Sequence, residues 1–389
     1  MPWRARSPMD ERLQFISDYQ RQLFTMTALC DRYGVSRKTG YELVARYEAA
    51  GVAGLASRSS RPQHSPQATA TPIVIAIVTM RRRYPTWGGK KIVAVLREQH
   101  PRWALPAVST ANDILKRYGL VQARRRRRPV GHPGYRPQTA TAPNEIWTTD
   151  FKGQFRMQDA QLCYPLTICD SYSRYLLACR GLRAPTSAGA VHVFRAAFRQ
   201  YGLPTTIRSD NGEPFAAPSL GRLSRLSVWW IRLGIRPDLI TPAAPYQNGA
   251  HERMHRTLKA EATYPSSADL GRQQRRFGAF RRRYNERRPH EALGQQPPSR
   301  VYTTSSRRLP DRLPLLEYPG HFEIRRISPG GTMSWHSRAM TVSTVLIGED
   351  IGLEPIDDGL WDLHFGPVRL GRLDERRGRI EPAGVWRRR

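Results

Sequence analysis

The pattern of apolar positions changes in kind along the chain. Between residues 10 and 47 apolar side chains recur at helical spacing, and helical spacing returns between residues 72 and 120. From Glu145 onward, short apolar runs alternate with polar residues as strands do, with helical runs between them. After Pro310 only short strand-like runs remain, divided by Gly and Asp. This order predicts all-α domains first, then an α/β domain, then a small all-β domain.

The first helical segment, residues 1–60, has the pattern of a helix-turn-helix. Gly34 would end one helix, Ser36 would cap the next, and Leu43 and Val44 would lie on its apolar side. The exposed start of that second helix would then face DNA, through Arg37, Lys38, Thr39 and Tyr41. An ordinary helical hairpin has the same pattern, so the pattern alone leaves both interpretations open.

A second helical segment, residues 70–122, follows a polar, Pro-rich linker at 57–72. Ser109 or Thr110 would cap its last helix. Two candidate DNA contacts lie in this segment, Lys90 and Lys91. We interpret it as a second helix-turn-helix domain, and two such domains in tandem could grip adjacent segments of one DNA site.

Residues 143–265 predict an α/β domain with a mixed five-stranded sheet, because three neighbouring strands are followed by alternating helices and strands. The strand-like segments are 145–153, 163–170, 173–180, 205–212 and 236–241. A very basic helical extension is expected over 266–305, and a small β-barrel-like domain over 310–389.

The net charge of the chain indicates what kind of partner it binds. The chain carries 63 Lys and Arg against 32 Asp and Glu, a net charge of +31, which is most simply explained by a polyanionic partner. Five consecutive arginines, Arg124, Arg125, Arg126, Arg127 and Arg128, lie in a basic linker at 123–142. Contact with phosphates and a merely solvated linker both fit this block.

Other features narrow the class of protein. No apolar run approaches the roughly 18 residues that a bilayer span needs, and the N-terminus lacks the apolar region of a signal peptide. The 4 cysteines have no zinc-binding spacing, which favours buried thiols in a reducing compartment. We therefore expect a cytoplasmic protein that does not bind membranes.

Residues 245–259 (PYQNGAHERMHRTLK) predict a turn and then a helix with a single acid among its bases. On a helical wheel, that acid shares one side of the helix with basic residues: Glu252, His255, Arg256 and Lys259. The opposite side carries the apolar residues Met254 and Leu258. Glu252 is thus expected to be displayed, either as a surface ion-pair partner or as a metal ligand that faces a polyanion.

Two further acids follow strands. Asp150 and Asp210 end predicted strands, with 59 residues between them and 41 between Asp210 and Glu252. Three carboxylates brought together would repel one another unless a cation joins them, and oxygen ligands suit Mg²⁺ or Mn²⁺. Two such ions can promote in-line displacement at phosphorus. Taken singly, Asp210 could be part of a turn and Asp150 a strand-end cap.

The region 143–302 resembles the DDE transposases of bacterial insertion sequences, which are related to retroviral integrases. The matching segments are WTTDFK at 147–152, SDNG at 209–212, QNGAHERMHRTLK at 247–259 and YNERRPHEAL at 284–293. The resemblance implies an RNase H-like core with Asp150, Asp210 and Glu252 as the metal-binding triad. It also implies that the basic residue seven positions after the glutamate, Lys259, contacts DNA near the reacting end.

The chain departs from the integrase pattern in two respects. The second interval, 41 residues, exceeds the 35 typical of integrases, so the loop after Asp210 is expected to carry an insertion. The zinc-binding His and Cys residues of retroviral integrases are missing from the sequence, and the helix-turn-helix segments take their place. Both departures leave the three acids intact.

The resemblance implies a transposase of a bacterial insertion sequence, nucleoid-associated and at least dimeric on DNA. It would bind the terminal inverted repeats through residues 10–120, cleave 3′ ends and join them to target DNA, with Mg²⁺ or Mn²⁺, two ions per site. Further DNA contacts are expected at Asn248 and Arg256. Two alternatives stay open: a DNA-binding regulator with an inert core, and a nuclease of the same fold that only cuts.

Overall fold

The computed structural model describes residues 7–57, 68–121, 139–240 and 249–383. The chain divides into two compact units, Met1–Ala68 and Thr69–Arg389. Two predicted DNA contacts, the arginine block 124–128 and Asn248, lie outside the described residues. Among the residues described, no helix is long and apolar enough to cross a lipid bilayer.

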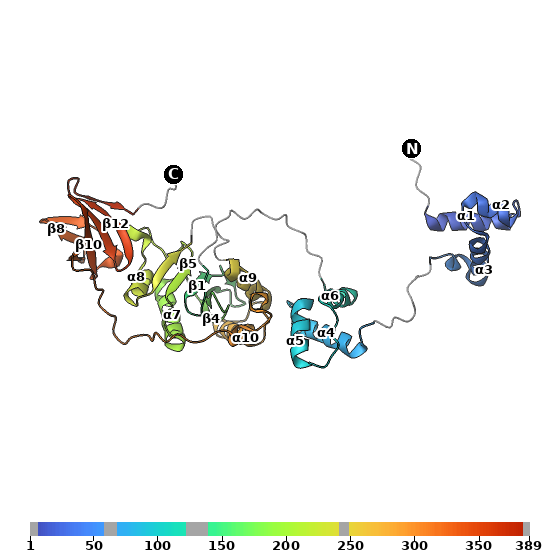
Figure 1. Ribbon diagram of the computed structural model, residues 1–389, viewed down its shortest axis with the longest axis horizontal. Coiled ribbons are helices and arrows are strands. Elements are labelled where there is room, and N and C mark those ends of the chain that lie inside the picture. Colours follow the sequence, from blue (N-terminus) through green and yellow to red (C-terminus); the bar gives the residue numbers. More distant parts are fainter. Residues whose placement is uncertain (1–6, 58–67, 122–138, 241–248, 384–389) are drawn as a thin grey trace. The chain divides into compact units, whose positions relative to one another are not determined.

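The described residues of the first unit form three helices, α1 (Pro8–Gln20), α2 (Met26–Tyr33) and α3 (Arg37–Gly54), the last interrupted at Gly51 (Figure 1). Gly34 ends α2 with a positive φ of 63°, and Ser36 caps α3 by accepting the Thr39 N–H, both as predicted. Gly40 lies where α3 meets α2, and a Cβ there would be 2.5 Å from Cys30 Sγ. Only glycine fits that close approach.

The second unit begins with another helical group, α4 (Thr71–Arg83), α5 (Gly89–Gln99) and α6 (Val108–Arg117). These helices share a core that includes Ile77, Trp87, Ile92, Leu96 and Ile114. The predicted cap of the last helix is wrong. Ala107 is the N-cap of α6 and makes no side-chain hydrogen bond there, because the helix begins before Ser109 and Thr110 and takes both into its first turn.

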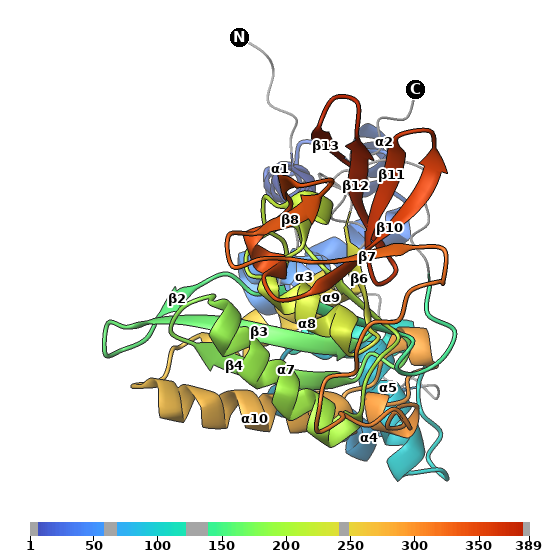
Figure 2. The same ribbon diagram turned by 90° about the vertical axis from the view of Figure 1, so that its left-hand side faces the viewer.

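The central sheet contains β1 (Ile146–Phe151), β2 (Phe155–Arg156), β3 (Leu162–Asp170), β4 (Leu176–Leu182), β5 (Thr206–Ser209) and β6 (Arg236–Leu239). Its order is β2-β3-β1-β5-β6, with β4 also paired to β3. Figure 2 shows β3 between β2 and β4. Pairings among β1 to β4 are antiparallel, whereas β1–β5 and β5–β6 are parallel. The sheet is therefore mixed, as predicted. It has six strands rather than five, because the two-residue β2 is too short to show alternation in the sequence.

Helices cover both faces of this sheet. On one face, α7 (Ser187–Tyr201) and α8 (Arg225–Arg232) pack over Trp147, Leu166 and Ile168. On the other, α9 (Gly249–Leu258) and α10 (Leu270–Glu286) pack over Cys163, Leu176 and Cys179. The basic extension predicted at 266–305 is thus part of the core, because α10 buries Phe277 and Phe280 against the sheet.

The C-terminal strands form an antiparallel sheet and a hairpin. The sheet has the order β13-β12-β11-β10-β7, from β7 (Glu323–Arg326), β10 (Asp350–Asp357), β11 (Leu360–Phe365), β12 (Val368–Asp374) and β13 (Arg379–Pro382). The hairpin joins β8 (Thr332–Trp335) and β9 (Arg338–Thr341). Their apolar side chains share one core with Val228 and Ile231 of α8, so these strands are anchored to a helix of the central α/β domain.

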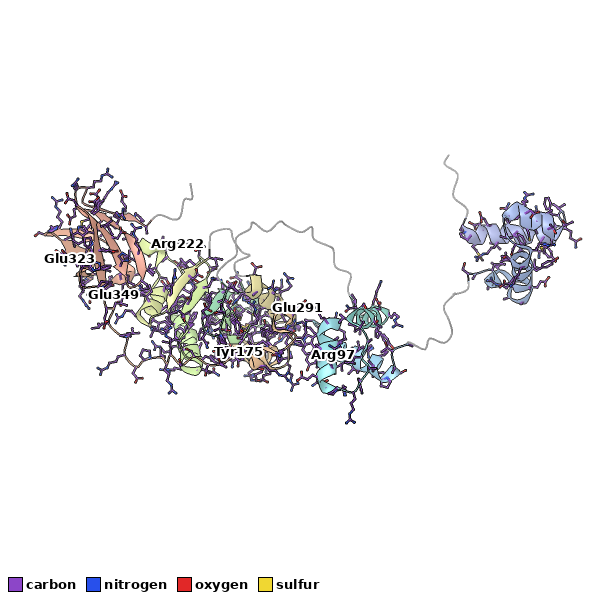
Figure 3. The ribbon with its side chains drawn as sticks, viewed as in Figure 1. Arg97, Tyr175, Arg222, Glu291, Glu323 and Glu349 are labelled. Atoms are coloured by element: carbon purple, nitrogen blue, oxygen red, sulfur yellow. The ribbon has the colours of Figure 1, made fainter. Side chains whose placement is uncertain are left out.

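The long interval between Asp210 and Glu252 has a structural explanation. It contains a short helix, η1 (Leu220–Arg222), that lies against β12. Gly221 has a φ of 66°, and a Cβ there would be 3.0 Å from Leu370 Cδ2. The extra residues therefore form a contact with the C-terminal sheet. Arg222 and Glu349, on the two sides of this junction, are labelled in Figure 3.

Candidate active site

The strand topology brings two of the predicted acids to one edge of the sheet. Asp150 lies near the carboxyl end of β1, and Asp210 follows the last residue of β5 directly. These strands are parallel neighbours, with Thr148 opposite Arg208, so their carboxyl ends meet at the same edge. Glu252 belongs to the first turn of α9. Three elements far apart in the sequence thus each contribute one acid.

The charges of these acids act on one another. Burial raises the pKa of Asp150 to about 7, with further increases from the charges of Asp210 and Glu252 and an opposing effect of Lys152. Burial also raises the pKa of Asp210, which a hydrogen bond from the Gly212 N–H partly offsets. A carboxylate at Asp150 is therefore held at a cost that a bound cation would remove.

The oxygen atoms of these acids are ligands that suit a hard cation, although in this structure the acids are not close enough together to hold one. No three His, Cys, Asp or Glu side chains of the described segments are spaced to hold a metal ion. Beside Asp210, the oxygen Oδ1 of Asn211 is buried and has no hydrogen-bond partner within the described residues. Carboxylates with a free amide oxygen next to them are ligands that Mg²⁺ or Mn²⁺ accepts.

The helical wheel of α9 is wrong in one respect. His255 was expected on the exposed side with Glu252, but it is buried, as is His251 one turn earlier. His255 Nδ1 approaches Asp150 Oδ2 to 3.5 Å. Burial lowers the pKa of His251 to about 3 and that of His255 to about 2, so this approach is not an ion pair at neutral pH. The prediction failed because the buried side of α9 is wider than its apolar residues alone indicate.

Two threonines of the sheet form hydrogen bonds with these histidines. Thr167 Oγ1 on β3 lies 2.7 Å from Nε2 of His251 and 2.7 Å from Nε2 of His255. Thr148 Oγ1 on β1 lies 2.9 Å from Nδ1 of His251. The sequence reasoning missed all four residues as part of the site. The available signal was the spacing of two histidines four residues apart on either side of Glu252, which places them on one helix face.

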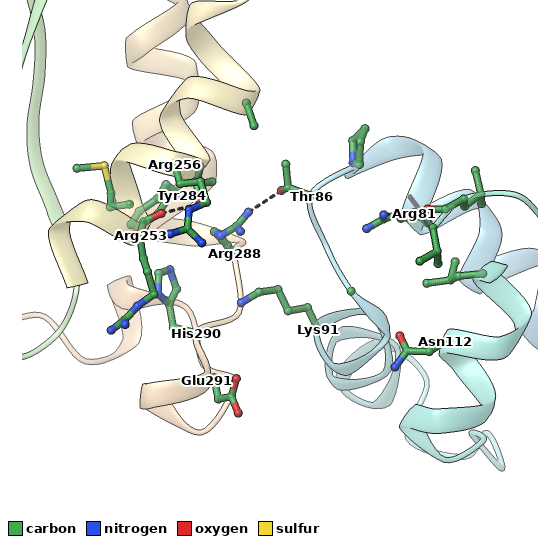
Figure 4. A pocket seen from close by; sticks show the side chains of 18 of the residues that line it. Arg81, Thr86, Lys91, Asn112, Arg253, Arg256, Tyr284, Arg288, His290 and Glu291 are labelled. Carbon is green, nitrogen blue, oxygen red and sulfur yellow. Dashed lines mark hydrogen bonds between the residues drawn. The ribbon is translucent and has the colours of Figure 1, made fainter. Parts of the chain in front are cut away.

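A basic cavity of about 1260 Å³ lies beside α9. Its lining includes one carboxylate, Glu291, and seven cationic side chains: Arg81, Arg82, Lys91, Arg174, Arg253, Arg256 and Arg288 (Figure 4). Arg253 and Arg256 belong to the helix that carries Glu252. Burial, and then the charge of Arg253, lower the pKa of Arg174. Like charges gathered in this way favour a polyanion as the occupant.

One side of this cavity is closed by polar contacts between the α4–α6 group and the core. Thr86 Oγ1 donates to Glu261 Oε1 at 2.5 Å and accepts from Arg288 Nη1 at 2.9 Å. Lys90 pairs with Glu291, and Lys91 donates to the Pro289 carbonyl. Burial lowers the pKa of Lys91 to about 8. The two lysines predicted as DNA contacts are therefore engaged with the chain itself.

The remaining predicted DNA contacts are exposed. Arg37, Lys38, Thr39 and Tyr41 lie in the first turns of α3, all exposed, with Thr39 also bonded to the capping Ser36. Arg256 is exposed on α9, and Lys259 is exposed at the start of η3 (Lys259–Thr263), the π-helical turn that continues α9. The first group belongs to the first compact unit and the second to the second unit.

Comparison with protein families supports this description of the core. Two models of the integrase core domain match residues 140–245 and 233–298. A model described as the leucine zipper of insertion element IS481 matches residues 5–83, the helical N-terminal region.

Individual relatives are distant but cover much of the chain. An uncharacterized protein of insertion element IS476 from Xanthomonas euvesicatoria is 24% identical over 69% of this chain and 75% of its own length. The transposase InsD of insertion element IS2 from Escherichia coli is 24% identical over 59% of this chain and 77% of its own. The integrase of a simian T-cell lymphotropic virus intasome is 16% identical over 75% of this chain and 97% of its own, with a TM-score of 0.35. The chain thus contains an integrase core domain and is similar to proteins of bacterial insertion elements, one of them a transposase.

Proposed function

We propose that this chain is a transposase that binds the terminal inverted repeats of an insertion sequence, cleaves DNA 3′ ends and joins them to target DNA. The observation that carries the proposal is that Asp150 and Asp210 lie at one edge of the sheet and that the charges of Asp210 and of Glu252, on α9, both raise the pKa of Asp150. The cavity with seven cationic side chains beside the same helix supplies the second requirement, a surface for the phosphate backbone.

Asp150, Asp210 and Glu252 would hold Mg²⁺ or Mn²⁺, two ions per site. When bound, such ions activate the attacking oxygen and stabilise the leaving oxygen at phosphorus. The chain's own residues bind and orient the DNA. Arg253 and Arg256 project from α9 into the basic cavity, and Lys259 continues the basic surface past the end of that helix. Arginine suits this role, because its guanidinium can donate two parallel hydrogen bonds to phosphate oxygens.

Recognition of the element ends belongs to the N-terminal helices in this proposal. Arg37, Lys38, Thr39 and Tyr41 would enter the major groove at the start of α3, the position that a recognition helix uses. The α4–α6 group would hold a neighbouring segment of the same end. Two ends must be joined together, so the active form is at least a dimer on DNA.

The experiment that tests the function uses the DNA that flanks the gene. Labelled fragments that end in its terminal inverted repeats are incubated with the protein, Mg²⁺ or Mn²⁺, and a supercoiled plasmid. The proposal predicts end-specific binding, 3′ nicking at the repeat and joining of the label to the plasmid. Binding without any cleavage would indicate a regulator with an inert core, and cleavage without joining would indicate a nuclease that only cuts.

A further inference from the structure

A single hydroxyl group joins the backbone of one acid to the helix of another. Thr167 is buried on β3, directly opposite Asp150 in the β1–β3 register. Its Oγ1 lies 3.0 Å from the Asp150 carbonyl oxygen and 2.7 Å from Nε2 of each histidine, His251 and His255. The two histidines flank Glu252 in the sequence of α9: His251 directly precedes it, and His255 follows it by three positions.

With Thr167 as the donor to the Asp150 carbonyl, the hydrogen-bonding capacity of its hydroxyl assigns the direction of its other two bonds. A threonine hydroxyl donates once and accepts twice. A carbonyl oxygen can only accept, so Thr167 donates to Asp150, and its two acceptor sites receive Nε2–H from His251 and from His255. The other ring nitrogen of His251 then accepts from Thr148 Oγ1 at 2.9 Å, and the single hydrogen of that hydroxyl is shared with the Cys169 carbonyl at 3.4 Å. The Thr167 hydroxyl thus makes its full set of hydrogen bonds, one donated and two accepted.

This arrangement restrains α9 at two points one turn apart. A helix held at one point can still rotate about that point, whereas two bonds four residues apart on one face also fix its rotation about the axis. Glu252 lies between the two restrained positions, so its direction from the helix is set with them. The same hydroxyl also bonds to the Asp150 carbonyl. The position of Glu252 is therefore fixed relative to the strand that carries Asp150.

We propose that Thr167 is a positioning residue that sets the placement of Glu252 relative to Asp150 for cation binding. The inference rests on the proposed function, in which these two acids are ligands of a shared site. Removal of the hydroxyl would leave α9 packed through Met254 and Leu258 and bonded to Thr148 through His251, but without the second restraint at His255. The cation would then have to order the helix on binding, and its affinity would fall.

The test compares three variants of the full-length protein. Thr167→Val keeps the shape and removes the hydroxyl, whereas Thr167→Ser keeps the hydroxyl. Thr149→Val is the matched control, because Thr149 is equally buried and its hydroxyl donates to the Thr167 carbonyl at 3.1 Å rather than to α9. Mn²⁺ binding is measured by electron paramagnetic resonance and by calorimetry, and thermal unfolding reports the stability of each variant.

The expected result is that Thr167→Val weakens Mn²⁺ binding by at least about tenfold, whereas Thr167→Ser and Thr149→Val stay within about threefold of wild type. If Thr167→Val and Thr149→Val bind Mn²⁺ alike at similar losses of stability, Thr167 is only a structural residue. Should Thr167→Val fail to fold, His255→Gln, which keeps a donor toward Thr167, is compared with His255→Leu, which does not. Equal affinities of that pair would likewise overturn the positioning role.

Failure of the underlying function has a different signature. Wild-type protein should bind Mn²⁺, and Asp150→Asn protein, measured in parallel, should not. Wild-type protein that binds no Mn²⁺, or Asp150→Asn protein that binds it normally, would remove the metal site itself and the role of Thr167 with it.

Discussion

Arg232 of α8 and Glu349, which precedes β10, form an ion pair, with Nη1 2.6 Å from Oε2. Only 15% of the Arg232 side chain and 20% of the Glu349 side chain are exposed. Arg232 also donates from Nε to the Pro314 carbonyl at 2.9 Å. The pair lies at the edge of the apolar core that α8 shares with the C-terminal strands. The C-terminal sheet is therefore fixed to the helix that follows the Asp210 loop.

Loss of this pair should destabilise the second unit. Arg232→Met leaves the Glu349 carboxylate largely buried without its partner, and we expect a cost of about 1–3 kcal/mol, between the values for exposed and buried pairs. The control is Arg376→Met, which breaks a pair whose side chains are 73% and 88% exposed and should cost less than about 1 kcal/mol. The midpoint of denaturant unfolding measures both. Equal shifts for the two variants would contradict the anchoring role.

Acid should weaken the fold through the buried histidines. In the folded protein the pKa of His255 is about 2, and in the unfolded chain it is near 6.5, so below pH 6.5 the unfolded state binds a proton that the folded state does not. The stability that neutral His255 contributes is thus present above about pH 6.5 and lost as the pH falls.

Denaturant unfolding at several pH values measures this loss. Wild-type stability should fall relative to His255→Gln by about 1.4 kcal/mol per pH unit below pH 6.5. Asp150 acts in the opposite direction, because its pKa is raised to about 7 and its contribution is lost as the pH rises through that value. Parallel pH profiles for wild type and His255→Gln would show that His255 is not buried in its neutral form.

End recognition should depend on the start of α3. Replacement of Arg37 and Lys38 by Gln is expected to weaken binding to the terminal repeats and to reduce its dependence on salt, because fewer counterions are released. Arg21→Gln is the control, since Arg21 is exposed in the same unit but lies at the C-cap of α1. Gel shifts over a series of salt concentrations measure both effects. Equal losses for the two proteins would assign recognition to net charge rather than to α3.

The arginine block at 124–128 should act without reading sequence. Replacement of its five arginines by Gln is expected to lower affinity for specific and random DNA by similar factors, because phosphate contacts carry no sequence information. Competition between the two DNAs in one binding reaction measures the ratio. A selective loss of specific binding would mean that the block reads bases or DNA shape.

The sequence was sufficient where one strong local signal decides the structure. The strand ends close to Asp150 and Asp210 and the helix around Glu252 are each visible in the sequence, and parallel strands then bring the first two acids to one edge. The helix cap at Ser36 is equally local, because its partner is the N–H of Thr39, three residues away.

Features that depend on long-range packing were not predictable in the same way. His255 appears polar on a helical wheel, and its burial is decided by Thr167, 88 residues earlier in the chain. The basic character of α10 suggested a separate extension, because the few apolar residues that it buries, such as Phe277 and Phe280, are outnumbered by arginines. The contact of η1 with β12 likewise joins two segments whose pairing no local pattern reveals.

We expect Glu252 to be a metal ligand of a DNA-joining site, and Glu252→Gln tests this role. The substitution keeps size and helix propensity and removes one charge; Glu286→Gln, at the exposed end of α10, is the control. Strand transfer with Mg²⁺ or Mn²⁺ is measured alongside a gel shift on the same ends. The account predicts that Glu252→Gln lowers cleavage and joining by orders of magnitude while end binding persists, and that Glu286→Gln changes neither. A Glu252→Gln protein that joins ends at a near wild-type rate would contradict it, because an exposed ion-pair partner costs at most about 1 kcal/mol.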